Sequence, residues 1–537
     1  MPIALSSNDP LERDMPLSQS VIWRLQREFY VQRGLKAWTE DLVPNFITNN
    51  PFIAEIYVRI VADFLGDCIA IGQKHAKPVS AEAPLRILEL GAGTGKFSFL
   101  FLRHLTALLR ARSIGLETIR YCMTDCSESL LQSWRGNSYL SEFVQSGILE
   151  FELLQAGGEL NPHFLNRKDA ETLSAKGPLV VIANYLFDSL PQDAFVINNG
   201  KISESLVTTT KSAGEEAGAH EALSSLQLSY RNVGLAPDRY TDPSWNQILE
   251  LYRTRLQAAT VLFPGEALKT LRQLGSLSDG TMLVLAADKG YAHEEDLSLS
   301  QGLPALEFHA ASCCFSQMVN FDAIGKYFEA DGGEALTPGK HFTSLNICAF
   351  LLGGRGHQFL ATRKVYCEAQ AAIGPDDVFT LLAWLNAHME EMSVPQILST
   401  LRLTRWDPIT LMRMFPILAR QLRNVVAERN DLHDAVMRVW ANHYPVSPGE
   451  NVIAFQCGVI LLELRFYEEA MSMFKASLQI LGASAATSYN LGLCSMALSR
   501  PSEALAFMAE ACNLDPAFEP ARLSRTKLEE QAAQNKG

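Results

Sequence analysis

The sequence predicts an α/β domain around a largely parallel, doubly wound sheet, with helices before it and an all-α region of repeats after it. Three observations support this prediction. Short apolar runs alternate with helical patterns between residues 85 and 353. Helical periodicity dominates residues 17–80 and the chain after 360, and two late segments repeat every 34 residues. We expect three parts: a helical segment over 1–80, an α/β domain over 81–355 and a helical domain over 360–537.

The composition is that of a folded chain without a membrane span. Hydrophobic residues make up 47% of the 537 residues and charged residues 20%, so several cores can form. A net charge of -13 without a dense basic stretch argues against nucleic-acid binding. We find no signal peptide and no run of about 18 apolar residues, and therefore expect no membrane partner. The ten cysteines contain no C-x-x-C pair, which predicts free thiols, no metal site and a cytoplasmic location.

Two helices are predicted over residues 18–38 and 50–70, separated by a loop rich in Pro and Asn. Six apolar runs of strand length follow, at 85–90, 119–124, 148–154, 177–187, 279–288 and 344–353. Residues 194–207 predict a hairpin that turns at Asn199-Gly200. By composition, residues 209–225 form a flexible surface insertion.

The C-terminal repeat lies within about 451–516. Positions 34 residues apart carry small or apolar side chains: Gly458 and Gly492, Ala470 and Ala504, Phe474 and Met508. The period and the small residues resemble tetratricopeptide (TPR) repeats, in which two antiparallel helices pack closely. Two units are few, so flanking helices, one of them after Pro520, should complete the stack. We expect a protein or peptide partner here; an appendage that only stabilises the enzyme or a homo-oligomer is the alternative.

A glycine-rich turn, Gly91-Ala92-Gly93-Thr94-Gly95, follows the first predicted strand. A P-loop would need Ser or Thr after Lys96, where Phe97 stands, and a dinucleotide fingerprint would need Gly at 96. Glu89 lies two residues before the turn. An acid at this spacing resembles motif I of class I S-adenosylmethionine (SAM) methyltransferases. Glycines let the backbone approach a nucleoside, and a carboxylate can meet the cationic methionyl end.

SAM is therefore the expected cofactor. The resemblance implies Glu89, Gly91, Ala92, Gly93 and Gly95 as cofactor-binding residues. Asp125 ends the second predicted strand, thirty residues after Gly95, where a carboxylate can accept both ribose hydroxyls. Capping of the following helix is its alternative role. In methyltransferases of this class the next strand ends near the adenine, which implies Gln155 and Ala156.

A closer family resemblance covers roughly residues 20–355. The run 177–200 resembles the Asn-Glu-x-x-Asp-Ala-Leu-Pro segment in the family of the mitochondrial complex I assembly methyltransferase and its bacterial relatives. The characterised member of that family symmetrically dimethylates a protein arginine. The matching residues here are Asn184, Asp188, Leu190 and Pro191. Residues 43–58 resemble the family's segment over the cofactor; there Thr48 and Asn50 either close the site or cap a helix.

One departure from the family's pattern bears on the acceptor. Tyr185 replaces the family's Glu after Asn184, and carboxylates are the natural partners of a guanidinium. Asp188 and Asp288 remain as carboxylates for that purpose. The candidate catalytic residues are Asn184, Tyr185, Asp188 and, as a base, His309; for His309 a structural role is the alternative.

Together these features predict a SAM-dependent methyltransferase. The expected fold is an α/β Rossmann-like methyltransferase domain with an N-terminal helical lid, plus an all-α TPR-like C-terminal domain. The expected acceptor is a protein, with arginine implied by the resemblance. The alternatives are a small-metabolite methyltransferase and a non-catalytic SAM-binding scaffold.

Overall fold

The computed structural model of the protein describes residues 10–40, 42–43, 46–75, 79–157, 177–211, 223, 226–304, 306–308, 314–339, 342, 344–353 and 358–534. The chain forms two compact units, Met1–Asp377 and Val378–Gly537. No helix within the described ranges is long and apolar enough to cross a membrane. Each unit has its own hydrophobic core.

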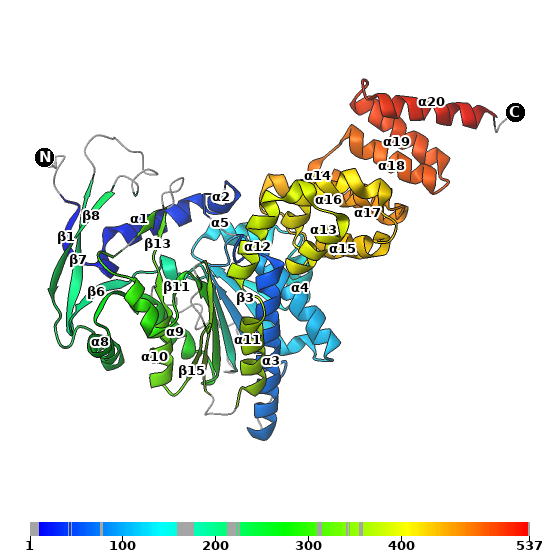
Figure 1. The fold of residues 1–537 in the computed structure, drawn as a ribbon. Helices are drawn as coiled ribbons and strands as arrows, with labels where there is room; N and C mark the ends of the chain where they lie inside the picture. The colour runs from blue at the N-terminus through cyan, green and yellow to red at the C-terminus, as the bar shows by residue number, and fades with distance from the viewer. Residues whose placement is uncertain are drawn as a thin grey trace. The chain divides into compact units, whose positions relative to one another are not determined.

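The first unit is built around a sheet that has seven strands among the described residues, in the order β15-β16-β10-β5-β2-β3-β4 (Figure 1). Their bounds are β2 Leu85–Leu90, β3 Ile119–Asp125, β4 Leu149–Leu153, β5 Leu179–Asn184, β10 Met282–Asp288, β15 Glu334–Leu336 and β16 Asn346–Leu352. Neighbours from β4 to β10 are parallel, whereas β16 runs antiparallel to β10 and β15. All six predicted apolar runs form strands of this sheet.

The strand order reverses between β2 and β5, because the chain moves outward through β3 and β4 and then returns to the other side of β2. Ligands of open α/β sheets bind at the carboxyl ends of the strands beside such a switch point. Strands β5 and β10 are almost wholly buried and read as continuous apolar runs, as expected of parallel strands covered on both faces. Figure 1 shows α9 and α10 on one face of the sheet and α3 and α11 on the other.

The α-helices of this unit are α1 Val21–Arg33, α2 Lys36–Thr39, α3 Pro51–His75, α4 Lys96–Ala111, α5 Glu128–Arg135, α6 Ser141–Gln145, α8 Pro243–Arg255, α9 Gly265–Gly275, α10 Phe321–Ala330 and α11 Leu360–Ala371. Short 3-10 helices throughout the chain are η1 Leu17–Gln19, η2 Leu116–Thr118, η3 Phe187–Ser189, η4 Glu294–Leu299, η5 Met389–Glu391, η6 Leu422–Asn424 and η7 Pro448–Val452. Two small ribbons pair β11 Gly290–Tyr291 with β14 Val319–Asn320, and β12 Glu307–Phe308 with β13 Phe315–Ser316.

A second, antiparallel sheet has the order β1-β7-β6-β9, with β8 also paired to β7. Its strands are β1 Glu12–Pro16, β6 Asp193–Asn198, β7 Lys201–Lys211, β8 Leu226–Gly234 and β9 Ala258–Phe263. The predicted hairpin is confirmed: Asn198 faces Lys201 across Asn199 and Gly200, both with positive φ. Residues 212–222 of the predicted flexible insertion lie outside the described residues.

Strand β1 corrects the prediction that residues 1–80 are helical only. Its sequence, Glu-Arg-Asp-Met-Pro, carries little strand signal. The Glu12 carboxylate accepts hydrogen bonds from Thr209 Oγ1 at 2.6 Å and from the backbone N–H of Val21 at 2.7 Å. These tertiary contacts place the segment at the edge of β7, and no local sequence pattern predicts them.

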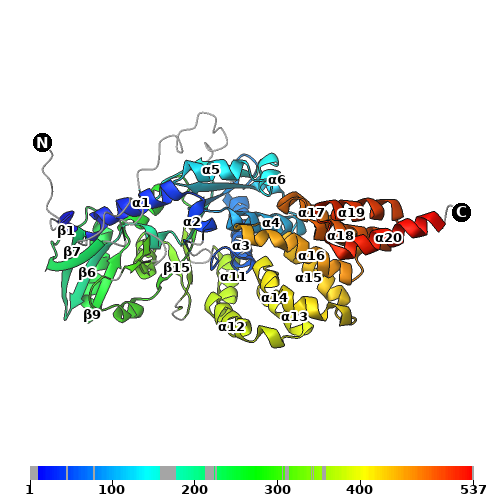
Figure 2. The ribbon, with the colours of Figure 1, turned by 90° about the horizontal axis from the view of Figure 1, so that it is seen from above.

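The second unit consists of helices, which Figure 2 shows from α13 in yellow to α20 in red. The bounds from the unit boundary onward are α12 Pro375–Ala387, α13 Val394–Leu403, α14 Pro408–Gln421, α15 Arg429–Ala441, α16 Ile453–Glu463, α17 Tyr467–Leu481, α18 Ala485–Ala497, α19 Pro501–Leu514 and α20 Glu519–Gln534. The sequence placed the boundary at 360, but α11 belongs to the first unit. The Tyr366 hydroxyl donates to the Ile347 carbonyl at 2.8 Å, and Thr362 donates to Asp67.

The aligned glycines of the repeat allow close helix packing. A Cβ on Gly458 would lie 2.6 Å from the ring of Phe474, and one on Gly492 would lie 2.7 Å from the Met508 methyl. Helices α17 and α19 begin 34 residues apart, at Tyr467 and Pro501. The TPR assignment itself stays a prediction.

Gly458→Ala should lower the unfolding free energy of the second unit by about 1–3 kcal/mol, because the buried Phe474 ring cannot move aside. The matched change Gly492→Ala should lie within about 1 kcal/mol of the native protein, because flexible Met508 can shift and Ala favours the helix. Calorimetric melting of the full chain, with hydrogen exchange in α16 to α19, measures both. Equal costs for the two changes would contradict this account.

Candidate active site

A cavity of about 180 Å³ lies at the carboxyl ends of β2, β3 and β5. A buried water needs only about 10–15 Å³ of such volume, so the cavity has room for a ligand of many atoms. The glycine turn, the ends of these strands, the segment after β4 and the helices α1 and α2 line it.

The glycine turn supplies the floor of the cavity through Gly91, Ala92 and Gly93. The three glycines at 91, 93 and 95 have φ of 67°, 53° and 80°, a left-handed backbone that favours glycine. Gly95 caps α4 and is not among the lining residues. Of the turn's predicted cofactor residues, the structure therefore brings all but Gly95 to the cavity.

Asp125 lines the cavity from the end of β3. Its carboxylate accepts hydrogen bonds from the backbone N–H groups of Gly93 at 3.2 Å, Cys126 at 2.7 Å and Ser127 at 3.3 Å. Burial raises its pKa. The N-cap of α5 is Ser127, so Asp125 is not the cap residue that the alternative role required.

Glu89 lines the same cavity from β2 and is 4% exposed. The hydroxyls of Ser98 and Tyr121 both donate to its Oε2, the latter at 2.7 Å. Burial raises the pKa of Glu89 to about 7, although these hydrogen bonds oppose the shift. A cation bound in the cavity would stabilise the ionised form of this carboxyl.

At the end of β5, Asn184 and Tyr185 also line the cavity. The Tyr57 hydroxyl donates to Asn184 Oδ1 at 2.7 Å, while Asn184 Nδ2 is buried without a hydrogen-bond partner among the described residues. Tyr185 has φ of 48°, a conformation that costs about 1–3 kcal/mol for a non-glycine residue. Asp288 holds the turn by accepting the N–H groups of Leu186 and Phe187 at 3.3 and 3.0 Å.

Asp188 and Asp288 are buried and do not line the cavity. Neither is therefore in position to orient a guanidinium there directly. Ser189, which does line the cavity, donates to Asp188 Oδ1 at 2.9 Å. The predicted base His309 lies outside the described residues.

Thr48, Gln155 and Ala156 line the cavity, as the predicted roles require. Asn50 instead caps α3, since its Oδ1 accepts the N–H of Ile53 at 3.1 Å. Of the two roles that the sequence left open, Thr48 thus has the one at the site and Asn50 the one at the start of a helix.

The sequence reasoning missed the residues that cover the cavity. Trp23, Gln26, Arg27 and Tyr30 of α1 line it together with Trp38 of α2. The four residues of α1 follow helical spacing, so they share one face of the helix. This helical spacing is a sequence signal from which these residues could have been predicted.

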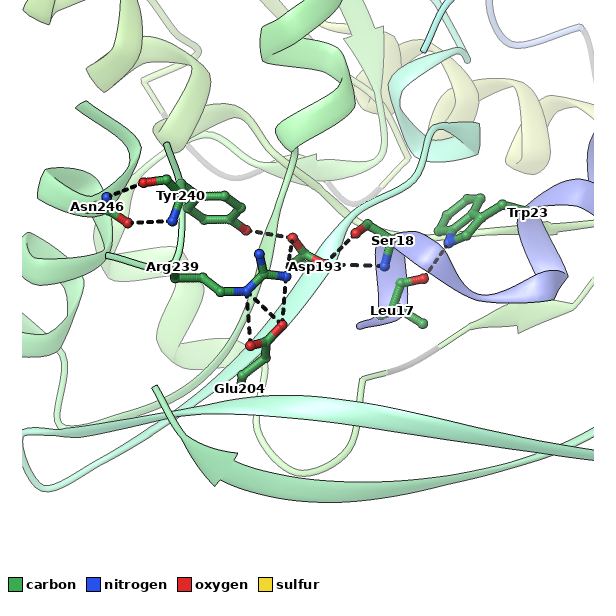
Figure 3. Close-up of polar contacts among 8 residues, drawn as sticks. All are labelled: Leu17, Ser18, Trp23, Asp193, Glu204, Arg239, Tyr240 and Asn246. Atoms are coloured by element: carbon green, nitrogen blue, oxygen red, sulfur yellow. Dashed lines mark hydrogen bonds and ion pairs between the residues drawn. The ribbon is translucent and has the colours of Figure 1, made fainter. Parts of the chain in front are cut away.

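A polar network anchors α1 to the second sheet (Figure 3). Asp193 of β6 accepts hydrogen bonds from Ser18 Oγ at 2.6 Å and from the Tyr240 hydroxyl at 2.7 Å. Arg239 lies between two carboxylates: it donates from Nε and a terminal nitrogen to Glu204 at 2.8–3.0 Å, and pairs with Asp193 at 3.4 Å. The segment before α1 is thus fixed by a hydrogen bond to Asp193, a buried carboxylate that Arg239 and Tyr240 hold in place.

The family model described as "Putative S-adenosyl-L-methionine-dependent methyltransferase" matches residues 68–321. No curated protein matches the chain. A solved Burkholderia thailandensis protein bound to S-adenosyl-homocysteine is 13% identical over 64% of this chain and 90% of its own, with a TM-score of 0.39. The citrinin polyketide synthase CMeT domain is 14% identical over 53% and 51%, with a TM-score of 0.24. MamA from Desulfovibrio magneticus is 19% identical over 31% and 90%, with a TM-score of 0.25.

The family match assigns SAM to the chain as its cofactor. The residues of the cavity fit this molecule. Gly91 and Gly93 expose backbone, Asp125 offers acceptors for hydroxyls, and Glu89 offers a buried negative charge. Asn184 Nδ2 is a buried donor without a partner among the described residues.

Asp193→Ala should loosen the cover, because Ser18 and Tyr240 lose their acceptor and Arg239 loses one of its two carboxylates. We expect hydrogen exchange in α1 to rise by about tenfold or more, corresponding to at least ~1.4 kcal/mol for local opening. Glu250→Ala, which removes an exposed pair with Arg253, is the matched control. Unchanged exchange in α1 after the Asp193 change would refute the anchoring role.

Proposed function

We propose that the chain transfers the methyl group of SAM to a protein substrate, with the helical repeat region recruiting that substrate. The observation that carries the catalytic part is the convergence of Glu89 and Asp125 on one cavity beside the glycine turn. The family match over residues 68–321 supports it independently. The 34-residue repeat supports the protein acceptor, because stacked helical repeats form extended binding surfaces.

In this proposal Asp125 would accept hydrogen bonds from the ribose hydroxyls, and Gln155 and Ala156 would lie beside the adenine. Glu89 would neutralise the cationic end of the cofactor. Asn184 Nδ2 donates to the cofactor's polar atoms. SAM supplies a methyl group on a positively charged sulfur, open to in-line attack by a nucleophile. The aromatic cover of Trp23, Tyr30 and Trp38 excludes water, and alignment of the nucleophile supplies much of the rate.

Arginine is the acceptor that the family resemblance implies. A guanidinium is best held by carboxylates that accept its forked donors. The described lining residues include only two carboxylates, Glu89 and Asp125, and the proposal uses both for the cofactor. A hydroxyl or amine of a protein is therefore the acceptor we favour. A small metabolite is the alternative acceptor, and binding without turnover is the alternative function.

The affinity for SAM should rise with pH between about 5.5 and 7.5. Glu89, with a pKa of about 7 in the free protein, must lose its proton to meet the cation, so below pH 7 binding releases a proton. The affinity should fall by up to about tenfold per pH unit below about 7. Calorimetric titration in buffers of different ionisation enthalpy measures both effects.

Glu89→Gln should bind SAM more weakly at pH 7.5 and lose this pH dependence. Glu117→Gln, which changes an exposed carboxylate, should keep both the native affinity and its pH dependence. A native protein that shows no heat with SAM would end the cofactor assignment. An identical pH profile for Glu89→Gln would remove the role of Glu89.

Incubation of the full chain with methyl-labelled SAM and cell lysate tests the acceptor. We expect label in the protein fraction, because the acceptor is proposed to be a protein. The variant Asp125→Asn should lose most of this label through weaker cofactor binding, by about ten- to a hundredfold. Label confined to small molecules would replace the protein acceptor by a metabolite.

A further inference from the structure

Two side-chain amides in the lining of the cavity have N–H donors without a partner. Gln26 of α1 and Asn184 at the end of β5 both line the cavity. Gln26 Nε2 and Asn184 Nδ2 are buried and have no hydrogen-bond partner among the described residues. An unpaired buried donor is costly, and such groups are almost always paired in folded proteins. Both amides therefore need an acceptor that enters the cavity.

The orientation of each amide is set by a residue that does not line the cavity. Gln26 Oε1 accepts the backbone N–H of Phe315 at 2.9 Å, and Asn184 Oδ1 accepts the hydroxyl of Tyr57 at 2.7 Å. A backbone N–H can only donate, so the Gln26 atom beside Phe315 has to be the oxygen. Both amide oxygens thus already have a donor, and each side chain still offers its nitrogen.

Asn184 lies beside the part of the cavity that Glu89 lines. Strand β5 is the parallel neighbour of β2, and Ala183 pairs with Leu90. Asn184 and Glu89 are each one residue from this pair, and neighbouring strands lie about 4.8 Å apart. Strand β3, which ends at Asp125, lies on the other side of β2. Asn184 therefore lies beyond Glu89, on the side away from Asp125.

Gln26 is tied to the same end of β5 through β13. Phe315, which holds the Gln26 oxygen, begins β13. The N–H of Gln317, directly after β13, donates at 3.2 Å to the carbonyl of Asp188 in η3, the short helix after β5. The ring of Trp23, one turn before Gln26, packs against Phe315 with centroids 5.0 Å apart. One unpaired amide thus belongs to the cover and the other to the sheet.

The proposed cofactor carries a suitable acceptor for these donors. Its methionyl end holds an ammonium and a carboxylate on the same carbon atom. In the proposed arrangement Glu89 meets the ammonium, so the carboxylate lies close by and must turn away from Glu89 itself, which has the same charge. A carboxylate has two oxygens with about four acceptor positions, which two amide nitrogens can share. Both amides lie on the side of Glu89 where this group would be.

We propose that Gln26 and Asn184 together bind the carboxylate of the cofactor's methionyl end, one from the cover and one from the sheet. The inference rests on the proposed function and adds Gln26 to the cofactor site. Because one ligand group joins both walls of the cavity, bound cofactor holds α1 closed. By linkage, contacts that favour the closed position of α1 tighten the cofactor to the same extent. SAM and S-adenosyl-homocysteine carry the same carboxylate, so product release requires the cover to open.

Arg27, the next residue of α1, is the alternative partner of the carboxylate. It also lines the cavity, but it is exposed. Solvent therefore hydrates its guanidinium in the free protein, whereas the nitrogen of Gln26 is buried. Consecutive residues also point about 100° apart around a helix, because it has 3.6 residues per turn. Burial favours Gln26, and the experiment changes both residues.

Calorimetric titration of the full chain with two ligands tests the carboxylate contact. S-adenosyl-homocysteine carries the ammonium and the carboxylate, whereas its decarboxylated analogue carries the ammonium alone. The native protein should bind S-adenosyl-homocysteine about a hundredfold more tightly, because both amides lose their charged acceptor in the analogue. Gln26→Glu and Asn184→Asp, which keep the oxygens that Phe315 and Tyr57 contact, should each reduce this ratio by about tenfold or more. Gln26→Met, which adds no charge, should also reduce it by about tenfold.

Three control variants separate this contact from its neighbours. Gln32→Glu, the same change at an exposed position of α1, should leave the ratio within about threefold of the native value. Arg27→Gln should do the same, because its exposed charge is screened by solvent. Glu89→Gln should weaken the binding of both ligands alike, because both carry the ammonium, and so should leave the ratio nearly unchanged.

Hydrogen exchange in α1 measures the closing of the cover without any turnover. S-adenosyl-homocysteine should slow this exchange by about tenfold or more in the native protein, and the decarboxylated analogue should slow it less. Without ligand, α1 of Gln26→Glu should exchange as in the native protein, because glutamate keeps an acceptor for the N–H of Phe315. A purely structural role for Gln26 would instead change the exchange without ligand and leave the ratio of affinities unchanged.

Equal binding of the two ligands by the native protein would overturn the carboxylate contact. So would a ratio that Gln26→Met and Gln26→Glu leave unchanged, including the case in which Arg27→Gln abolishes it and Arg27 is the partner. In each of these cases, binding of S-adenosyl-homocysteine by the native protein would leave the methyltransferase proposal standing. A native protein that binds neither SAM nor S-adenosyl-homocysteine would instead remove the proposed function.

Discussion

The carboxylate of Asp125 is the constraint on which the site depends. It accepts the N–H of Gly93 and so joins the end of β3 to the turn that follows β2. The bond forms because β2 and β3 are parallel neighbours in register, with Leu90 opposite Thr124, so that their carboxyl ends lie at one edge of the sheet. Gly93 reaches it through a left-handed backbone conformation. The floor of the cavity therefore depends on the order of the strands as well as on the glycine turn.

Several buried carboxyl groups lie in the lining of the cavity or behind it. Burial raises the pKa of Glu89, Asp125, Asp188 and Asp288, so each ionised form is less favourable in the folded protein than in the unfolded chain. The pKa of Glu89, for example, rises from 4.5 to about 7. Between these pH values the folded state holds a proton that the unfolded state releases, so this carboxyl's contribution to stability falls as pH rises. The apolar strands β5 and β10 offset such costs, and a bound cation removes part of them.

The sequence predicts those parts of the fold whose signal is local. Six strands of the main sheet read as apolar runs of strand length, and the resemblance to the methyltransferase motif, together with the end of the second strand, places Glu89, the glycine turn and Asp125 at one site. Strand β1 was missed because a distant partner, β7, places it, and β8 because it is largely exposed or half-exposed along its length. Strand β9 was also missed, although its residues form a buried apolar run. The cover residues were missed for a related reason. An aromatic stripe on α1 is consistent with an ordinary core-facing helix until the cavity beneath it is known.

The cover of the cavity is held by contacts between segments that are far apart in the sequence. Tyr30 lines the cavity from α1. Ser18, just before α1, donates a hydrogen bond to Asp193, and Gln26 of α1 accepts one from the backbone N–H of Phe315 at 2.9 Å. All these partners are more than a hundred residues from α1 in the sequence. Loss of these contacts would therefore open the cover and admit water to the cavity. The shielding of the cavity from solvent thus depends on β6 of the second sheet and on β13 as well as on α1 itself.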